Sequence, residues 1–407
     1  MPVGLAYELP DIHPVAGVYL GATAAKIKKN GKTDLVVIEF APESVTAATF
    51  TTNACCAAPV HVAKKHLAKT QPRALLINSG NANAATGESG FANAKQTCQW
   101  LADELGCEPE EILPFSTGVI GEPLPMNKIQ LGLVAAVADR AIDHWPHAMA
   151  GIMTTDIVPK MVSRVVSIDG HDITITGMAK GSGMIHPNMA TMLGFVATDA
   201  KITEELLQAC LSQAVKKSFN RITVDGDTST NDACTLTATQ QADMPSITDA
   251  ESTAYKAFAV EIERVMTELA QMIVRDGEGA TKFISVEVNG GLSEAECLKV
   301  AHAVALSPLV KTAMFASDPN WGRILAAVGR AGVEQLDINR LEIFLGDVCI
   351  VRDGGRAADY TEDQGQKVMK AEDISVRIEL NRGQHSETVW TCDFSYDYVK
   401  INAEYRS

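Results

Sequence analysis

The sequence predicts a mixed α/β fold, and two observations about its pattern lead to that class. Stretches typical of strands alternate with stretches typical of helices along the chain, without a fixed repeat period or a low-complexity linker. The chain has 407 residues, of which 46% are hydrophobic and 21% charged, so it can bury a large core in two lobes or one large domain. A mixed α/β protein is therefore favoured over a solenoid or an array.

Two β-hairpins are predicted in the first half of the chain. Residues 16–27 and 32–40 flank an Asn-Gly pair at 30–31, and both residue types tolerate a positive φ. The second hairpin should run through residues 164–176 and turn at the Asp-Gly pair 169–170.

Apolar residues at helical spacing predict three helices with one face suited to covering a sheet, at residues 92–105, 204–219 and 254–274. Ser293 and Glu296 stand at the spacing of a capping box, which predicts a helix start there. Strands are expected at residues 192–197, 341–345, 349–351, 374–380 and 388–394.

The charge balance excludes several classes of partner. The chain carries 35 Lys and Arg against 50 Asp and Glu, a formal net charge of −15, which opposes binding to nucleic acid or to an anionic membrane surface. The first residues lack the basic and apolar regions of a signal peptide, and no apolar stretch is long enough to span a bilayer. We expect a cytoplasmic protein that acts on a small molecule.

The nine cysteines are scattered and form neither a CxxC pair nor the spacing of a zinc site. We expect reduced, mostly buried thiols and no bound metal. The adjacent pair Cys55 and Cys56 is interpreted as two small apolar fillers and not as a redox pair.

Four segments concentrate Gly, Asn, Thr and Ser where the hydrophobic periodicity stops, which is typical of loops that carry a site. They are residues 78–83, 116–121, 180–191 and 223–232. The third leads directly into Thr191 and then into an apolar run, which places this hydroxyl at a loop-to-strand junction. Such a threonine is usually structural, so composition alone does not identify it as a nucleophile.

Other apparent motifs do not predict a cofactor. The Gly-Ser-Gly at 181–183 lacks the third glycine and the helix of a dinucleotide site, and residues 225–227 lack the glutamate that closes a calcium loop. We expect residues 225–227 instead to support the site through hydrogen bonds. His186 is interpreted as a turn residue, and Trp321 and Arg323 as packing at a helix start.

The joined segment at 180–193, Lys-Gly-Ser-Gly-Met-Ile-His-Pro-Asn-Met-Ala-Thr-Met-Leu, closely resembles the self-cleavage segment of the ornithine acetyltransferase family. Residues 78–83, 223–232 and 317–323 are similar to the same family, so the resemblance covers nearly the whole chain. It implies a layered α-β-β-α sandwich with a second, smaller α/β lobe, divided near residues 277–279. It also implies a cut between Ala190 and Thr191 into chains of residues 1–190 and 191–407.

The chemistry of threonine accounts for such a cut. A Thr191 hydroxyl held in a strained loop attacks the preceding carbonyl, and water then opens the resulting ester. The new α-amine, with a typical pKa of about 7.7–8.0, is a general base for the hydroxyl beside it. By the resemblance, Thr117 and Gly118 form the oxyanion hole. Without the resemblance of the Thr191 segment, the Thr-Gly pair would be interpreted as an ordinary turn.

The resemblance also implies a set of substrate-binding positions: Thr154, Lys180, Thr191, Glu278, Asn402 and Ser407. Lys180 suits a carboxylate and Glu278 an ammonium group. Many family members end in threonine where this chain has Ser407, which keeps the hydroxyl but puts its packing in question.

The implied reaction is a ping-pong transfer of acetyl from N2-acetyl-L-ornithine through Thr191 to L-glutamate, without a cofactor, in an α₂β₂ assembly of two processed protomers. Acetyl-CoA is a second donor in some relatives. The sequence does not distinguish a bifunctional enzyme, which also uses acetyl-CoA, from a monofunctional one. The lack of a phosphate-binding loop slightly favours the use of acetylornithine alone. Two alternatives stay open: a self-processing amidohydrolase or aminopeptidase, and a non-catalytic amino-acid-binding protein that remains one chain.

Overall fold

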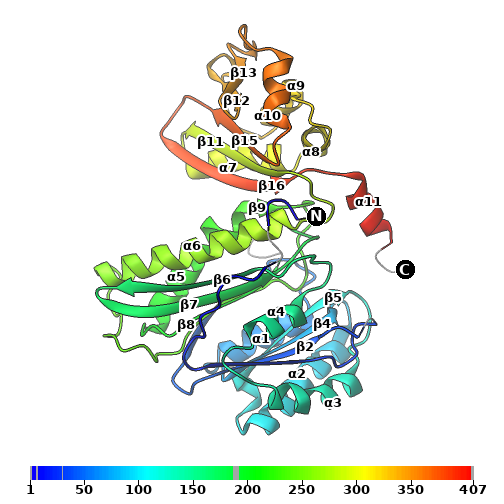
Figure 1. Ribbon diagram of the computed structural model, residues 1–407, viewed down its shortest axis with the longest axis vertical. Coiled ribbons are helices and arrows are strands. Elements are labelled where there is room, and N and C mark those ends of the chain that lie inside the picture. The colour runs from blue at the N-terminus through cyan, green and yellow to red at the C-terminus, as the bar shows by residue number, and fades with distance from the viewer. Residues whose placement is uncertain (1, 6–7, 30, 187–191, 405–407) are drawn as a thin grey trace.

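Three β-sheets organise the chain, and a computed structural model describes residues 2–5, 8–29, 31–186 and 192–404. Two of the sheets pack face to face in a first lobe with helices on both outer sides, and the third sheet forms a second lobe (Figure 1). This arrangement confirms the predicted α-β-β-α sandwich with an additional α/β lobe.

The first sheet has the strand order β1-β2-β4-β5. Its strands are β1 (Val18–Thr23), β2 (Leu35–Phe40), β4 (Ala74–Asn81) and β5 (Ile112–Val119). The helices around it are α1 (Ala58–Leu67), α2 (Gly87–Leu105), α3 (Met126–Ala138) and α4 (Trp145–Ile152), with a short 3₁₀ turn at Pro109–Glu111. Leu35 and Val37 pack outward among α2 and α3, whereas Val36 and Ile38 face the second sheet and α4. Because both faces are covered, the first four residues of β2, 35–38, are all apolar.

The second sheet has the order β3-β10-β8-β7-β6. Its strands are β3 (Val45–Phe50), β6 (Met161–Ile168), β7 (His171–Lys180), β8 (Leu193–Thr198) and β10 (Ala233–Ala238). Helices α5 (Glu204–Lys217) and α6 (Thr253–Arg275) cover its outer face, and a 3₁₀ turn spans Phe219–Arg221. Strand β8 lies between antiparallel β7 and parallel β10, and β3 pairs with β10.

The third sheet has the order β14-β13-β12-β15-β11-β16-β9. Its strands are β9 (Ile222–Thr223), β11 (Phe283–Gly291), β12 (Glu342–Leu345), β13 (Val348–Arg352), β14 (Gly355–Arg356), β15 (Asp373–Glu379) and β16 (His385–Cys392). Its helices are α7 (Glu294–Ala305), α8 (Pro308–Phe315), α9 (Trp321–Gly329) and α10 (Glu362–Met369), with a 3₁₀ turn at Ile338–Arg340 and the C-terminal α11 (Tyr396–Ala403). The predicted boundary at 277–279 falls between α6 and β11. Strand β9, from earlier in the chain, nevertheless completes this sheet by pairing with β16.

The predicted hairpins are both present, but they differ in their turns. Ile168 pairs with His171 across Asp169 and Gly170, whose φ angles of 49° and 86° are those of a tight turn. The first hairpin pairs Thr23 with Leu35, so its connection spans residues 24–34 and is much longer than the Asn-Gly pair suggested. The carboxylate of Asp34 organises this loop, because it accepts the backbone N–H groups of Ala25 (2.7 Å) and Lys28 (2.8 Å).

The three predicted helices correspond to α2, α5 and α6. At the start of α7, Ser293 accepts the N–H of Glu296 at 3.2 Å, as predicted. The Glu296 carboxylate accepts the N–H of Leu292 instead of that of Ser293, so only half of the capping box forms. Trp321 begins α9, where Asn320 caps the N–H of Arg323 at 3.1 Å.

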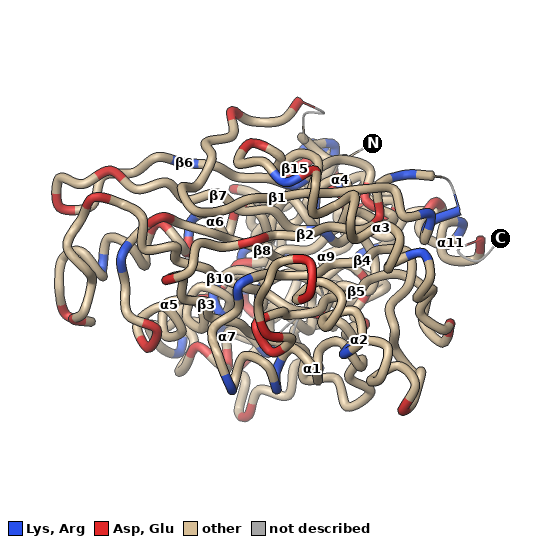
Figure 2. Tube along the Cα trace, turned by 90° about the horizontal axis from the view of Figure 1, so that it is seen from below, with Lys and Arg blue, Asp and Glu red and all other residues tan. Residues whose placement is uncertain are grey.

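Charged residues of both signs are interspersed around the periphery of the fold (Figure 2). Among the described residues, no single helix is long and apolar enough to cross a bilayer, and only the bent pair α7 and α8 reaches that length and composition jointly. Five cysteines are buried, whereas Cys55 is exposed.

Candidate active site

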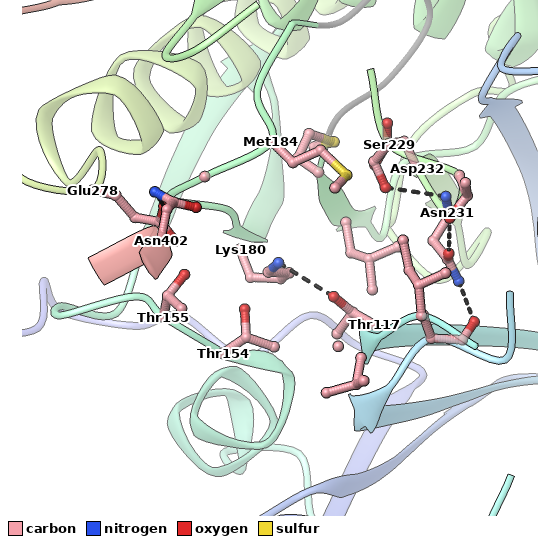
Figure 3. A pocket seen from close by; sticks show the side chains of 18 residues that line it. Thr117, Thr154, Thr155, Lys180, Met184, Ser229, Asn231, Asp232, Glu278 and Asn402 are labelled. Carbon is pink, nitrogen blue, oxygen red and sulfur yellow. Dashed lines mark hydrogen bonds between the residues drawn. The ribbon is translucent and has the colours of Figure 1, made fainter. Parts of the chain in front are cut away.

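A cavity of about 280 Å³ lies where the ends of β5 and β7 and the start of β8 meet the segment after α6 and the C-terminal helix (Figure 3). Its lining comprises Ala82, Thr117, Gly118, Val119, Ile120, Thr154, Thr155, Lys180, Gly183, Met184, Met192, Leu193, Ser229, Thr230, Asn231, Asp232, Glu278 and Asn402. The lining includes six of the predicted site residues, from five separate parts of the chain: Thr117, Gly118, Thr154, Lys180, Glu278 and Asn402.

Three of the predicted positions, Ala190, Thr191 and Ser407, lie outside the described residues. Met192 and Leu193, which follow Thr191 in the chain, line the cavity. The roles assigned to these three residues remain predictions.

Thr117 and Gly118 stand at the end of β5, where it runs close beside β4. Gly118 has a φ of +131°, and a Cβ atom there would lie 2.4 Å from the carbonyl carbon of Gly80 and 2.6 Å from the nitrogen of Asn81. Only glycine fits this position. The glycine of the Thr-Gly pair is therefore explained by the close approach of the β4 and β5 backbones at the wall of the cavity.

Lys180 projects from the end of β7 into the centre of the cavity, between Thr117 and Glu278 (Figure 3). Its ammonium group donates a hydrogen bond to Thr117 Oγ1 at 3.3 Å, and the side chain is largely buried. A positive charge thus stands directly beside the hydroxyl of the predicted oxyanion hole, where it would stabilise a developing negative charge.

Glu278 and Asn402 form the opposite end of the cavity from Asp232 (Figure 3). Asn402 Nδ2 donates to Glu278 Oε2 at 2.9 Å, which brings α11 back onto the first lobe. Ser395 fastens the start of α11 by donating to the carbonyl oxygen of Gly279 at 2.6 Å. A Cβ atom at Gly183 would lie 2.3 Å from the Glu278 carboxylate, so a larger residue there would displace this carboxylate.

A buried ionic network that the sequence did not indicate supports these groups. Lys160 contacts Asp156 at 2.6 Å and Asp276 at 2.5 Å, and all three side chains have no exposed area. Asp156 also accepts the backbone N–H groups of Thr154 (2.9 Å) and Gly181 (2.8 Å). The network therefore joins the backbone at Thr154 to the end of β7 and to the residues that precede Glu278.

Burial and charge act in opposite directions on the two carboxyl groups of this network. Burial would raise the pKa of Asp156, but the ammonium groups of Lys160 and Lys180 hold that pKa far below its usual range. Burial raises the pKa of Asp276 and outweighs the attraction of Lys160.

The loop at residues 223–232 holds the segment that leads to Pro187. Asp225 accepts the N–H groups of Met184 (2.6 Å) and Ile185 (2.8 Å), and Thr228 donates to the carbonyl of His186 at 3.0 Å. Asp225 thus supports the backbone of the segment that leads toward the predicted nucleophile, whereas direct support of Thr191 by residues 225–227 stays a prediction.

Asn231, in the same loop, forms hydrogen bonds to the two remaining candidate site loops, residues 78–83 and 116–121. Its side-chain amide donates to the carbonyls of Ala82 (2.6 Å) and Ser116 (2.9 Å). The four segments that the sequence marked as candidate site loops therefore converge on one cavity.

His186 packs edge-on against the ring of His302 on α7, with 5.4 Å between ring centroids. Burial lowers the pKa of both rings, that of His302 to about 4. His186 is thus a packed side chain, which agrees with the structural and not the catalytic interpretation of this residue.

Asp232 is a site residue that sequence reasoning missed. It is only 3% exposed and lines the cavity beside the start of β8. The sequence pattern that could have identified it is an acidic residue directly before a strand, β10, in which every residue is buried.

The fold is an α/β sandwich of two facing sheets, and the cavity at their strand ends combines a hydroxyl, a buried ammonium and a carboxylate–amide pair, a set of groups suited to acyl transfer. The chain belongs to the ArgJ family, whose model matches residues 19–407. This confirms the resemblance to the ornithine acetyltransferases.

Two relatives match over the full length of the chain. The chain is 56% identical, over 100% of both chains, to the arginine biosynthesis bifunctional protein ArgJ of Pseudomonas syringae pv. tomato and to that of Pseudomonas fluorescens. It is also similar to the crystal structure of the arginine biosynthesis bifunctional protein from Bacillus halodurans, with 39% identity and a TM-score of 0.50. That match covers 53% of this chain and 100% of the other.

Proposed function

We propose that this protein is a glutamate N-acetyltransferase of arginine biosynthesis, which moves acetyl from N2-acetyl-L-ornithine to L-glutamate through an acetyl-Thr191 intermediate. The observation that carries the proposal is the convergence of Thr117, Lys180, Glu278 and Asn402 on one cavity beside the strand that follows Thr191. Full-length relatives named for arginine biosynthesis support the choice of pathway.

The first half-reaction begins when the Thr191 hydroxyl attacks the acetyl carbonyl and its α-amine takes the proton. The developing oxyanion is stabilised by the Thr117 hydroxyl and the Gly118 N–H, with the Lys180 ammonium beside them. The C–N bond then breaks, and ornithine leaves with the proton returned to its amine. The amine of glutamate attacks the ester in the second half-reaction and regenerates the hydroxyl.

The size and charges of the cavity suit amino acids that bind one after the other. A volume of about 280 Å³ is slightly below the roughly 300–1,000 Å³ typical of ligand pockets, which favours sequential occupancy by donor and acceptor. Glu278 complements the side-chain ammonium of ornithine, and Lys180 complements a carboxylate.

We propose acetyl-CoA as a second acetyl donor, and no other cofactor. The support is that the relatives that match at 56% identity are named as bifunctional proteins, which favours the bifunctional alternative over use of acetylornithine alone.

The proposed function is tested with purified protein supplied with acetylornithine and glutamate, with acetyl-CoA and glutamate, and with each donor alone. We expect N-acetylglutamate to form only when glutamate is present. Release of free acetate at a rate independent of glutamate would favour the amidohydrolase or aminopeptidase. Binding of acetylornithine by a single uncut chain without turnover would favour the non-catalytic protein.

Removing residues 402–407 is expected to raise the apparent KM for acetylornithine strongly, on the order of tenfold for each lost charge-assisted contact of about 1.4 kcal/mol. The physical reason is that Asn402 bonds to Glu278, which would bind the ornithine ammonium. The measurement is steady-state kinetics beside a control with Leu292→Ala, an exposed residue outside the cavity. Unchanged kinetics of the truncated protein would exclude the C-terminal tail from substrate binding.

We also propose a cytoplasmic location and an α₂β₂ assembly of two processed protomers, as the family resemblance implies. Native mass spectrometry distinguishes this assembly from a single processed protomer.

A further inference from the structure

Three side chains of the kinds that bind metal ions lie together at the junction of α3 and α4, outside the lining of the cavity. Asp139 is the C-cap of α3, His144 is the N-cap of α4, and His147 stands in the first turn of α4. One ligand atom from each residue lies within 4.8 Å of those of the other two. No other such group of histidine, cysteine or acidic side chains occurs in the part of the chain that the structure describes.

The separation of the first two ligand atoms is that of a tetrahedral zinc site. His144 Nδ1 lies 3.3 Å from Asp139 Oδ2. Ligands at about 2.0–2.2 Å from a tetrahedral zinc ion are about 3.3–3.5 Å from one another. His144 Nδ1 is also buried and has no hydrogen-bond partner among the described residues. Such a nitrogen requires an explanation, and in a tetrahedral site each lone pair points at the ion and not at the neighbouring ligand.

The third ligand completes the site from the solvent side. The ring of His147 lies against that of His144, with 4.5 Å between the centroids. His147 is exposed, whereas Asp139 and His144 are partly buried. An exposed ring can turn about its side-chain bonds, which brings its nitrogen to the ligand distance. Water then has access to the fourth position of the tetrahedron, as in zinc sites with three protein ligands.

The backbone of β1 holds the Asp139 carboxylate in place. Asp139 Oδ2 accepts the N–H of Ala22 at 3.0 Å, and an antiparallel bridge joins Leu20 to Ala141. Groups that orient a metal ligand in this way typically raise metal affinity about 10–100-fold. An ion bound by Asp139 and the two histidines would fasten the connection between α3 and α4 to the edge strand of the first sheet.

The neighbouring charges admit a cation at this junction. The guanidinium of Arg140 is paired with the Glu39 carboxylate, so its positive charge is balanced. The C-terminal end of α3 attracts a cation and the N-terminal end of α4 repels one, and these partial charges largely cancel. The Asp139 carboxylate therefore supplies the net attraction.

We propose that Asp139, His144 and His147 bind a zinc ion, which stabilises the junction of α3 and α4 and takes no part in acetyl transfer. Two imidazoles and a carboxylate suit a borderline ion such as Zn²⁺, whereas Mg²⁺ and Ca²⁺ prefer oxygen ligands alone. The expectation of no bound metal rested on the spacing of the cysteines, and this site contains none. The inference does not depend on the proposed function.

The test is titration of the metal-free protein with Zn²⁺ in competition with a chromophoric chelator. We expect one ion per protomer, bound about tenfold or more weakly by His147→Ala and by Asp139→Asn, which each remove a ligand. The matched control is His385→Ala, an exposed histidine at the start of β16, which should bind like the wild type. Cys55→Ser removes the exposed thiol and should also bind like the wild type.

A second measurement follows the thermal stability of the same proteins. Zn²⁺ should raise the Tm of the wild type by about 2 °C or more, because an ion that binds only the folded state stabilises it. The Tm of His147→Ala should not change when Zn²⁺ is added. Because His147 is exposed, this variant keeps the packing of α4.

Three results would overturn the inference. The first is a wild-type protein that binds no Zn²⁺ at concentrations on the order of micromolar. The second is equal binding, or an equal rise in Tm, for the wild type and His147→Ala. The third is loss of binding in Cys55→Ser, because a thiol would then be the ligand.

Discussion

Thr191→Ala is expected to leave the protein as one uncut chain and to reduce acetyl transfer by a factor on the order of 10⁴ or more. The alanine lacks the hydroxyl that attacks the preceding carbonyl, so no cut occurs. Without a cut, no α-amine is released, and the same substitution removes both nucleophile and base. A denaturing gel with intact mass, followed by the acetylornithine and glutamate assay, measures both effects.

Two variants control this result. Thr203→Ala removes a hydroxyl that makes no capping hydrogen bond at the start of α5, and it should be cut and active like the wild type. Thr191→Ser keeps a hydroxyl and an amine, and it should still yield two chains. Two chains from Thr191→Ala would show that another residue performs the cleavage.

Lys160→Met is expected to lower the free energy of unfolding by about 3–5 kcal/mol, because it leaves the Asp156 and Asp276 carboxylates buried without their counter-ion. Asp156 holds the N–H groups of Thr154 and Gly181, so the displaced backbone should also reduce substrate affinity. Urea denaturation of wild type and variant measures the change in stability.

The comparison for Lys160 is an exposed ion pair. Lys256→Met breaks a pair with Glu251 in which both side chains are mostly exposed, and it should change stability by less than about 1 kcal/mol. The triple variant Asp156→Asn, Lys160→Met, Asp276→Asn should regain part of the loss, since no buried charge is left alone. Equal effects of the Lys160 and Lys256 variants would contradict the role given to the network.

Local patterns predicted the parts of the fold that depend on neighbouring residues. The Asp-Gly turn at 169–170 and the helices α2, α5 and α6 follow from φ preferences and apolar periodicity. The pairing of β9 with β16 joins residues more than 160 positions apart, and a two-residue strand has no period to detect. Sheet order of this kind is decided by tertiary packing.

The site divides in a similar way. Loops rich in Gly, Asn and Thr were recognisable, and the family resemblance supplied roles for Thr117, Lys180 and Glu278. Lys160 and Asp156 were missed because a buried i,i+4 ion pair has the same sequence spacing as a solvated one. Asp232 was missed because the sequence does not show that this residue is buried at the wall of the cavity.

The strand order of the second sheet determines what a cut between residues 190 and 191 can do to the molecule. Strands β3, β6 and β7 precede the cut, β8 and β10 follow it, and the ladders β7–β8 and β3–β10 cross between the two groups. The halves are thus interleaved, and losing one peptide bond leaves every ladder in place. Produced separately, each half would present bare strand edges to solvent, which promote aggregation. The two chains should therefore be recoverable only from a precursor that folds first, and not by mixing them afterwards.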